Sequence, residues 1–389
     1  MSSIAILLLG IAGLCFGWFV YSRYVATHIY KLDPDFVTPA HELEDGVDYI
    51  PTNKYVLWGH HFTSVAGAAP IVGPAIAVYW GWIPAILWVI FGSIFFAGVH
   101  DMGAIWASIR HKGKSIGALS ENVIGPRTRA LYMVVVFLVL LMVNSVFGVI
   151  IANAFVSTPS SVIPAWSAIA VALVIGQLLH RNLMRLGLLT AIGVIVLYAT
   201  IFVGSEMPLS LPSGLPGLGI PATWIIILFV YAAIASMLPV WMLLQPRDFI
   251  NGMQLAVGLL LLYGAVLIAG PEMTAPAFNH QLAEGTPSMM PLLFVTIACG
   301  AVSGFHGIVA SGTTSKQLNK ETDARFVGYF AALGEGALAL ITLIVVGGVA
   351  LAATPEAWHE TYSHFGSGSV GAFITGGANL IERGWGVYR

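Results

Sequence analysis

The sequence has few charged side chains, and this shortage limits the kind of protein it can encode. Asp, Glu, Lys and Arg make up 9% of the 389 residues, whereas the AVILMFWYC set makes up 58%. A soluble domain carries roughly a quarter charged residues. So few charges could not cover the surface of a soluble fold, but a protein surrounded by lipid can expose apolar side chains. The composition therefore predicts an integral membrane protein.

Cysteine and net charge are also scarce. The two cysteines, Cys15 and Cys299, lie inside apolar runs, which is typical of small membrane residues and not of a disulfide or metal pair. The formal net charge is -2, so nothing indicates a nucleic-acid partner. The sequence has no P-loop motif, and its polar loops are too short for an ATPase domain. Any transport is therefore expected to use an ion gradient.

Long apolar runs predict the membrane spans. A spanning helix needs about 20 mainly apolar residues. The candidate runs are 3–22, 55–80, 83–109, 130–157, 163–180, 186–205, 222–245, 254–270, 290–312, 327–353 and a last one that starts near 369. They predict an all-α integral membrane protein with about ten transmembrane helices. The first run lacks a preceding charge and an obvious cleavage site, so it is expected to be a retained helix and not a signal peptide.

The positions of the cations predict the orientation of these spans. Of the 16 Lys and Arg residues, all except Arg383 and Arg389 fall in alternate loops. The intervening loops, 158–162, 206–221, 271–289 and 354–368, contain none. Because positively charged loops stay on the cytoplasmic side, we expect a protein of the bacterial inner membrane with its N-terminus outside.

The order of the spans suggests an internal repeat. Without the first helix, the remaining ten divide into five plus five, and an odd number of spans per half inverts the second half relative to the first. That is the LeuT-like 5+5 inverted-repeat plan. The expected parts are an extra N-terminal helix (1–22), a cytoplasmic loop (23–54), a first repeat (55–205), an external loop (206–221) and a second repeat (222–389).

In the LeuT-like plan, the first helix of each half is broken in mid-membrane. Proline removes a backbone donor and costs a helix about 3 kcal/mol, so its carbonyls become free for an ion or substrate. Gly and Pro interrupt 55–80, and Ser236 and Pro239 interrupt 222–245; Gly and Pro are also common in unbroken membrane helices. The substrate-binding candidates are His60, His61, Gly67, Ala68, Pro70, Gly73, Ser236 and Pro239.

Ionisable residues inside the spans form a second group of candidates. Such residues are costly in lipid and tend to mark relays. A rise of about 1.5 Å per residue places the pair His60–His61 and the pair His100–Asp101 at similar depth, so the two pairs could meet. A carboxylate beside an imidazole suits proton transfer, although a polar bridge that fixes packing would look the same. The relay candidates are His100, Asp101, His306 and Glu335; for Glu335 a structural role on a peripheral helix is favoured.

The run 290–312 carries small and hydroxyl side chains at three- and four-residue steps, so they share one helix face. Hydroxyls and carbonyls on such a face could hold Na⁺, and a seam for tight helix packing would show the same pattern. The candidate cation ligands are Ala66, Ser303, Ser311 and Thr314.

Four blocks resemble the signature of the carbon starvation protein A family: DGVDYIPTNKYVLWGHHFTSVAGAAPIVGP (45–74), AGVHDMGAIWASIRHKGKSIG (97–117), LLQPRDFIN (243–251) and SGFHGIVASGTTSKQL (303–318). The resemblance implies a LeuT-like inner-membrane transporter that takes up peptides or pyruvate when preferred carbon is scarce. It implies no enzyme activity and no cofactor beyond a coupling ion, H⁺ or Na⁺. Members of the family are usually longer, so the second repeat is expected to be incomplete here.

Two other functions compete with a symporter. His60, His61, Asp101, His100 and His306 could hold a metal in an intramembrane enzyme, but adjacent histidines point to different sides of a helix and no HExxH spacing occurs. A channel would need a polar stripe on several helices, which the sequence does not show. The side chains around the expected break are mostly small and apolar, so pyruvate and a peptide both remain open as substrates.

Overall fold

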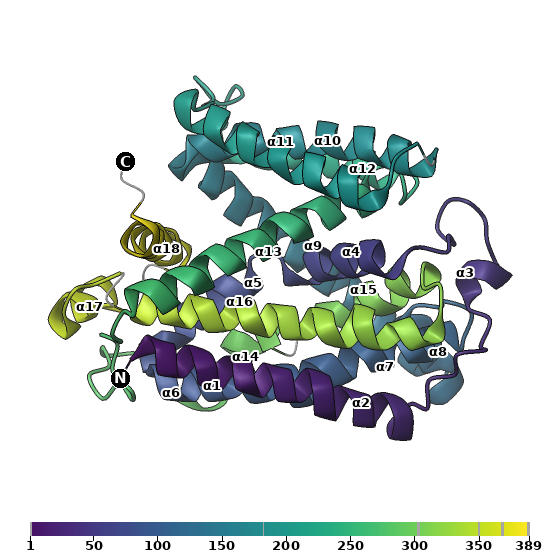
Figure 1. Cartoon of the computed structure of the whole chain (residues 1–389), viewed down its shortest axis with the longest axis horizontal. Coiled ribbons are helices and arrows are strands. Elements are labelled where there is room, and N and C mark those ends of the chain that lie inside the picture. The colour runs from purple at the N-terminus through teal and green to yellow at the C-terminus, as the bar shows by residue number, and fades with distance from the viewer. Residues whose placement is uncertain (1, 182, 302–303, 349–350, 367–368, 387–389) are drawn as a thin grey trace.

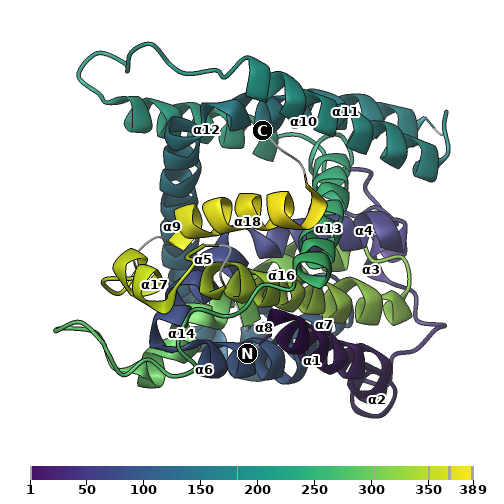
Figure 2. The same ribbon diagram turned by 60° about the vertical axis from the view of Figure 1, so that its left-hand side comes forward.

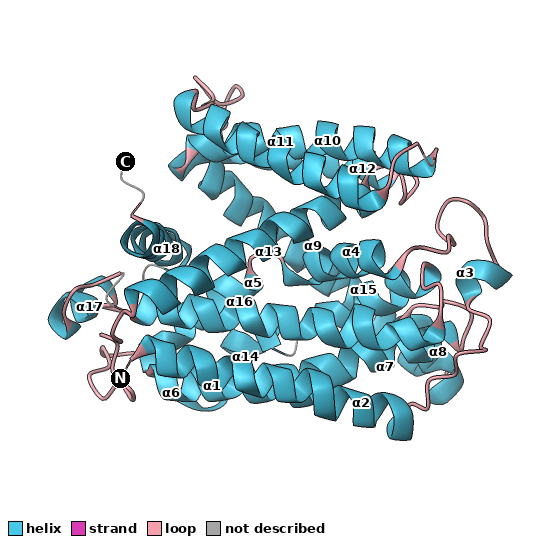
Figure 3. Cartoon of the chain, in the orientation of Figure 1, coloured by secondary structure: helices cyan, strands magenta, loops and turns pink. Residues whose placement is uncertain are grey.

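The computed structural model describes residues 2–181, 183–301, 304–348, 351–366 and 369–386, and all its regular elements there are helices (Figure 3). Within these residues, seven helical segments are long and apolar enough to cross a membrane, or eight if one bent pair counts as a span. A helix forms hydrogen bonds between its own backbone N–H and C=O groups, which is necessary in lipid because no water is present to bind them. The all-helical prediction is confirmed, and the chain is a multi-pass membrane protein.

In chain order the helices are α1 (Ser3–Phe16), α2 (Ser22–Tyr24), α3 (Pro39–Glu42), α4 (Lys54–Ala66), α5 (Ala69–Ala77), α6 (Trp82–Phe91), α7 (Gly98–Ile109), α8 (Ile116–Val123), α9 (Pro126–Ser157), α10 (Val162–His180), α11 (Leu186–Glu206), α12 (Ile220–Ser236), α13 (Leu244–Ala269), α14 (Met289–Ala301), α15 (Gly304–Gly312), α16 (Phe330–Gly347), α17 (Pro355–Thr361) and α18 (Ser369–Trp385). Short π-helical or 3₁₀ turns extend some of them, so that Ser3–Ile29, Trp82–Ile109 and Glu321–Gly347 each form one continuous span.

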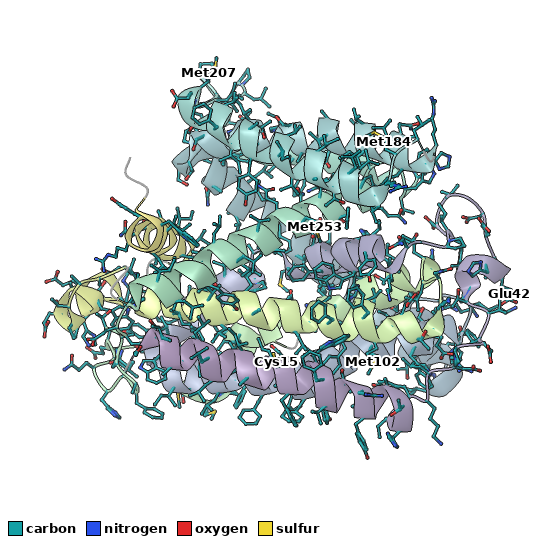
Figure 4. The ribbon with its side chains drawn as sticks, viewed as in Figure 1. Cys15, Glu42, Met102, Met184, Met207 and Met253 are labelled. Carbon is teal, nitrogen blue, oxygen red and sulfur yellow. The ribbon has the colours of Figure 1, made fainter. Side chains whose placement is uncertain are left out.

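The helices form a central bundle and an outer layer. In Figure 1, α10, α11 and α12 lie above the rest, and Figure 2 shows α9 rising from the bundle to them. Met253 of α13 lies below this layer (Figure 4) and packs, with Met184, against a buried apolar cluster around Ile175, Leu189 and Ile250. The labelled Cys15 lies on α1, where it is exposed. The outer layer therefore rests on α13 through apolar side chains.

Helix α16 lies at the centre of the bundle, which corrects the expectation that the helix carrying Glu335 is peripheral. In the span that contains α16, 83% of the most apolar segment is buried inside the protein, whereas the corresponding share for the long helix α9 is 6%. Small residues permit this position: a Cβ at Gly336 would collide with the Ser93 side chain between α6 and α7. Hydropathy marks both as membrane spans but does not report which neighbours cover a helix.

The predicted run 222–245 is also corrected. Helix α12 ends at Ser236, α13 already begins at Leu244, and Pro239 lies in the short connection between them. Ser236 and Pro239 therefore do not break a membrane helix. The connection is itself apolar, so hydropathy could not separate it from the helices on either side. Pro246 falls in the first turn of α13, where its missing N–H is tolerated.

The break expected in the run 55–80 is present. Helix α4 ends at Ala66, α5 begins at Ala69, and the two halves bend by 44°. Gly67 has a positive φ of 50°, which side chains other than glycine rarely adopt. Pro70 stands in the first turn of α5, and a Cβ at Gly73 would collide with the carbonyl oxygen of Thr296 on α14. This glycine thus lets α5 and α14 pack backbone to backbone.

Candidate proton-transfer site

Four ionisable side chains from four helices form a buried chain in the bundle, and each is 0% exposed. His61 of α4 places Nε2 at 3.4 Å from Oδ2 of Asp101 on α7. His306 of α15 places Nδ1 at 2.9 Å from the same oxygen and Nε2 at 2.7 Å from Oε2 of Glu335 on α16. The expected meeting of the two pairs is therefore observed, through His61 and Asp101.

The two ends of this chain differ in hydrogen bonding. At one end, Nδ1 of His61 lies 2.8 Å from Oγ1 of Thr314, so both ring nitrogens have polar partners. At the other end, the contact between His306 and Glu335 has the distance of an ion pair but not the angles of a hydrogen bond. Among the residues that the structure describes, neither Glu335 oxygen has a hydrogen-bond partner, and His306 supplies the charge that can compensate this acid in an apolar interior.

One side chain connects the cluster to the surface. Nδ1 of His100 lies 3.2 Å from Oδ1 of Asp101, and the His100 side chain is 39% exposed. Its ring lies over Gly307 of α15, where a Cβ would be 2.9 Å from Cε1. A larger residue at 307 would displace the imidazole. His100 therefore gives Asp101 a partner that is itself partly exposed.

His60 faces a different direction from its neighbour, as consecutive residues on a helix do. Its Nδ1 lies 2.9 Å from Oδ2 of Asp248 on α13, and Ser64 donates to the same oxygen at 3.0 Å. Thr63 also donates to the backbone carbonyl of Asp248 at 2.9 Å. Asp248 is not among the site candidates that the sequence predicted. The only signal available was an acid within the apolar surroundings of LLQPRDFIN.

The hydroxyl groups considered as Na⁺ ligands bind other protein groups. Ser311 Oγ donates to the carbonyl of Gly307 at 2.6 Å and accepts from the backbone N–H of Ile116 at 2.9 Å. Thr314 is the partner of His61. Ala66 is the last residue of α4, beside the break. Ser303 lies outside the described residues.

Three of the four histidines considered as metal ligands meet at Asp101, and the fourth, His60, does not. His60 is bound to Asp248 on α13, away from the chain that His61 enters. Among the residues that the structure describes, no group of three or more His, Cys, Asp or Glu side chains is arranged to hold a metal ion. The arrangement is instead a linear series of acids and imidazoles, which suits the movement of protons.

These features define a multi-pass helical membrane protein with an ionisable chain at its centre. The sequence model of the family "Carbon starvation protein CstA" matches residues 2–361. The chain therefore belongs to the carbon starvation protein CstA family.

Two relatives illustrate the similarity. The chain is 36% identical over 333 residues to the "Pyruvate/proton symporter BtsT" of Escherichia coli, an alignment that covers 83% of this chain and 46% of the relative. It is 35% identical over 355 residues to the "Peptide transporter CstA" of Campylobacter jejuni, covering 88% of this chain and 50% of the relative. The chain thus spans about half the length of these curated relatives. No solved structure matches it significantly.

Proposed function

We propose that the chain is a proton-coupled secondary transporter, and not an enzyme, that takes up a small organic acid or short peptide across the bacterial inner membrane with its N-terminus outside. The names of the relatives support both solutes, and one of them is a proton symporter. The observation that carries the proposal is the buried chain from His61 through Asp101 and His306 to Glu335.

In this proposal the proton enters at His100 and moves to Asp101. The imidazole of His306 then accepts it at one ring nitrogen and releases a proton from the other toward Glu335. Because each side chain comes from a different helix, every change of charge alters the attraction between two helices. A charge in this dry interior is costly, so protonation favours one packing over another. H⁺ is preferred to Na⁺ as the coupling ion, because Ser311 and Thr314 already have protein partners.

The proposal includes an inverted repeat with a revised second half. The pair α14–α15 packs with the broken pair α4–α5, with α14 on α5 and α15 on α4. Each pair supplies a histidine, His61 or His306, and is followed by a long helical span that supplies an acid, Asp101 or Glu335. We therefore take α14 and α15, instead of 222–245, as the counterpart of α4 and α5 in the second half. Substrate release would follow when the two pairs move relative to their neighbours.

The test is uptake into proteoliposomes that contain the purified chain. Labelled pyruvate and labelled dialanine are supplied separately, and a pH gradient and a Na⁺ gradient are imposed separately. We expect one solute to accumulate under the pH gradient, and accumulation to disappear when a protonophore collapses that gradient. Uptake that follows the Na⁺ gradient alone would contradict proton coupling.

With His41→Asn as its matched control, the variant His306→Asn tests the site. It removes the second ring nitrogen and so interrupts the path from Asp101 to Glu335. His41→Asn changes an exposed histidine of α3 instead. Uptake should be lost in the first variant and retained in the second. Full proton-driven uptake by folded His306→Asn protein would show that the buried chain does not carry the coupling proton.

A further inference from the structure

A cavity of about 360 Å³ lies between α9, α10 and α12, beside the first turn of α13. Its walls are mainly apolar and aromatic, with Phe147, Ile151, Trp166 and Phe229 among them. Its polar groups include Asn144, Tyr231 and Arg247. A cavity of this size with apolar walls and few polar groups has the character of a small-molecule site.

Arg247 is the one charged side chain among the described residues that line this cavity. It forms no ion pair with any acid in the described part of the chain; its Nη1 donates to the hydroxyl oxygen of Tyr231 at 3.2 Å. The neighbouring acid, Asp248, is occupied by His60 and Ser64. A half-buried guanidinium therefore faces the cavity without a counter-ion, although a charge in such surroundings normally acquires one.

We propose that this cavity is the solute site and that Arg247 binds the carboxylate of an organic monoacid there. This inference rests on the proposed transport function and names its substrate class. A guanidinium presents a planar fork of donors that matches the two oxygens of a carboxylate. Trp166 and Phe229 would cover the apolar remainder of the acid. The described lining holds no acidic side chain for the ammonium group of a peptide, so a monoacid fits better than a zwitterion.

The cavity also touches the helix break. A Cβ at Gly67 would lie 2.9 Å from Cζ of Phe147, so this cavity wall rests directly on the point where α4 changes direction. Arg247 is linked in sequence to Asp248, and His60, the partner of Asp248, is linked in sequence to His61. The anion site and the buried ionisable chain are therefore joined by two peptide bonds and one hydrogen-bonded pair.

The test is equilibrium binding of labelled pyruvate to the purified chain in detergent, with no gradient imposed. Arg247→Gln should raise the Kd at least tenfold, while Arg185→Gln, which removes an exposed cation from the loop before α11, should leave it unchanged. Unlabelled methyl pyruvate, which lacks the carboxylate, should not compete, and dialanine should compete weakly. An unchanged Kd in Arg247→Gln, or full competition by methyl pyruvate, would overturn the assignment.

A second pair of variants keeps the test valid if Arg247→Gln does not fold. Asn144→Asp adds a nearly isosteric acid to the cavity wall and should weaken binding by repelling the carboxylate. Asn153→Asp adds the same charge on α9 at an exposed position outside the cavity lining, and it should leave binding unchanged. Equal weakening by both variants would contradict the site. Competition by inorganic phosphate or phosphatidylglycerol as strong as that by unlabelled pyruvate would instead show a general anion or lipid-headgroup site.

The outcome is separable from that of the transport experiment. Binding that depends on Arg247, together with no uptake under any gradient, would support the site and overturn proton-coupled transport. Proton-driven uptake of pyruvate with a normal Kd in Arg247→Gln would support transport and overturn the site.

Discussion

Nδ1 of His306 lies 2.9 Å from Oδ2 of Asp101, and both side chains are completely buried. The other ring nitrogen of the same imidazole lies 2.7 Å from Glu335. An imidazole between two carboxylates has an acceptor on each side for any proton it carries. When the imidazole is protonated, it attracts an ionised acid in each of two helix pairs, α7–α15 and α15–α16. Transfer of that proton to either acid leaves a neutral ring and removes the attraction between opposite charges in both pairs.

Asp101→Asn should abolish proton-driven uptake while it preserves the fold. The amide has nearly the same shape as the carboxylate but cannot take up a proton near neutral pH. We therefore expect accumulation under a pH gradient to fall by about 100-fold or more. Exchange of labelled for unlabelled solute, which needs no net proton movement, should persist. Asp35→Asn, at an exposed loop position, serves as the control. Normal accumulation in Asp101→Asn would exclude this residue from the relay.

Glu335→Gln separates a relay role from a structural one. If the carboxylate acts as a carrier, the amide should block coupled uptake, while the melting temperature stays the same or rises, because a buried charge is removed and His306 keeps Asp101 as its partner. The measurement is thermal unfolding in detergent beside uptake. Thr342→Val changes another buried polar group of α16, the Thr342 hydroxyl bonded at 2.8 Å to the Leu338 carbonyl, and should leave uptake unchanged. A large fall in melting temperature with Glu335→Gln would favour the structural role.

The sequence predicted most spans and the break at Gly67, because both follow from local chemistry: apolar length in the first case, glycine and proline in the second. It misplaced the connection before α13, because the residues around Pro239 are as apolar as a helix. It also could not give the central position of α16 or the pairing of His60 with Asp248. Both depend on contacts between residues far apart in the chain, such as the 188 positions between His60 and Asp248, and a single sequence carries no record of them.

Gly67→Ala should destabilise the protein by about 1–3 kcal/mol. Its backbone has φ 50°, and the added Cβ would lie 2.9 Å from the ring of Phe147. Gly258→Ala on α13 is the matched control, because a Cβ there meets nothing within 4 Å. That variant should be neutral or slightly stabilising, since alanine favours a helix interior. Denaturant unfolding in detergent measures both, and equal stabilities would contradict the role of the glycine at the break.

The loop that precedes α4 should keep its order in mild acid. Slight burial tends to raise the pKa of the Asp45 carboxyl, but donation by the backbone N–H groups of Val47, Tyr49 and Asp48 lowers this pKa overall. Because the pKa of this carboxyl is lower in the folded protein, its stabilisation is fully present at pH values above the pKa of the unfolded chain. It is lost as the pH falls through the pKa of the folded protein. The amide resonance of Val47 should therefore shift only at pH values below the ordinary pKa range of an aspartate.

Asp45→Ala provides the comparison for this titration, because it removes the acceptor and leaves the chain length unchanged. The acid-dependent shift of the Val47 amide should vanish in that variant. If the Val47 amide resonance of the unmodified protein shifts at a pH equal to the ordinary aspartate pKa, the three backbone N–H groups do not bind the carboxylate of the protein in solution.

Helix α13 presents opposite charges on two of its sides, because Arg247 and Asp248 follow one another and consecutive helical residues point about 100° apart. It meets α4 through glycines: a Cβ at Gly59 would lie 2.9 Å from the Cα of Phe249, and one at Gly252 would lie 3.4 Å from the Cα of Gly59. The contacts that His60, Thr63 and Ser64 of α4 make with Asp248 hold the two helices together at the same place. A movement of α13 would therefore turn the cation and the anion by the same angle, so that solute and proton would sense each other through the rigidity of a single helix.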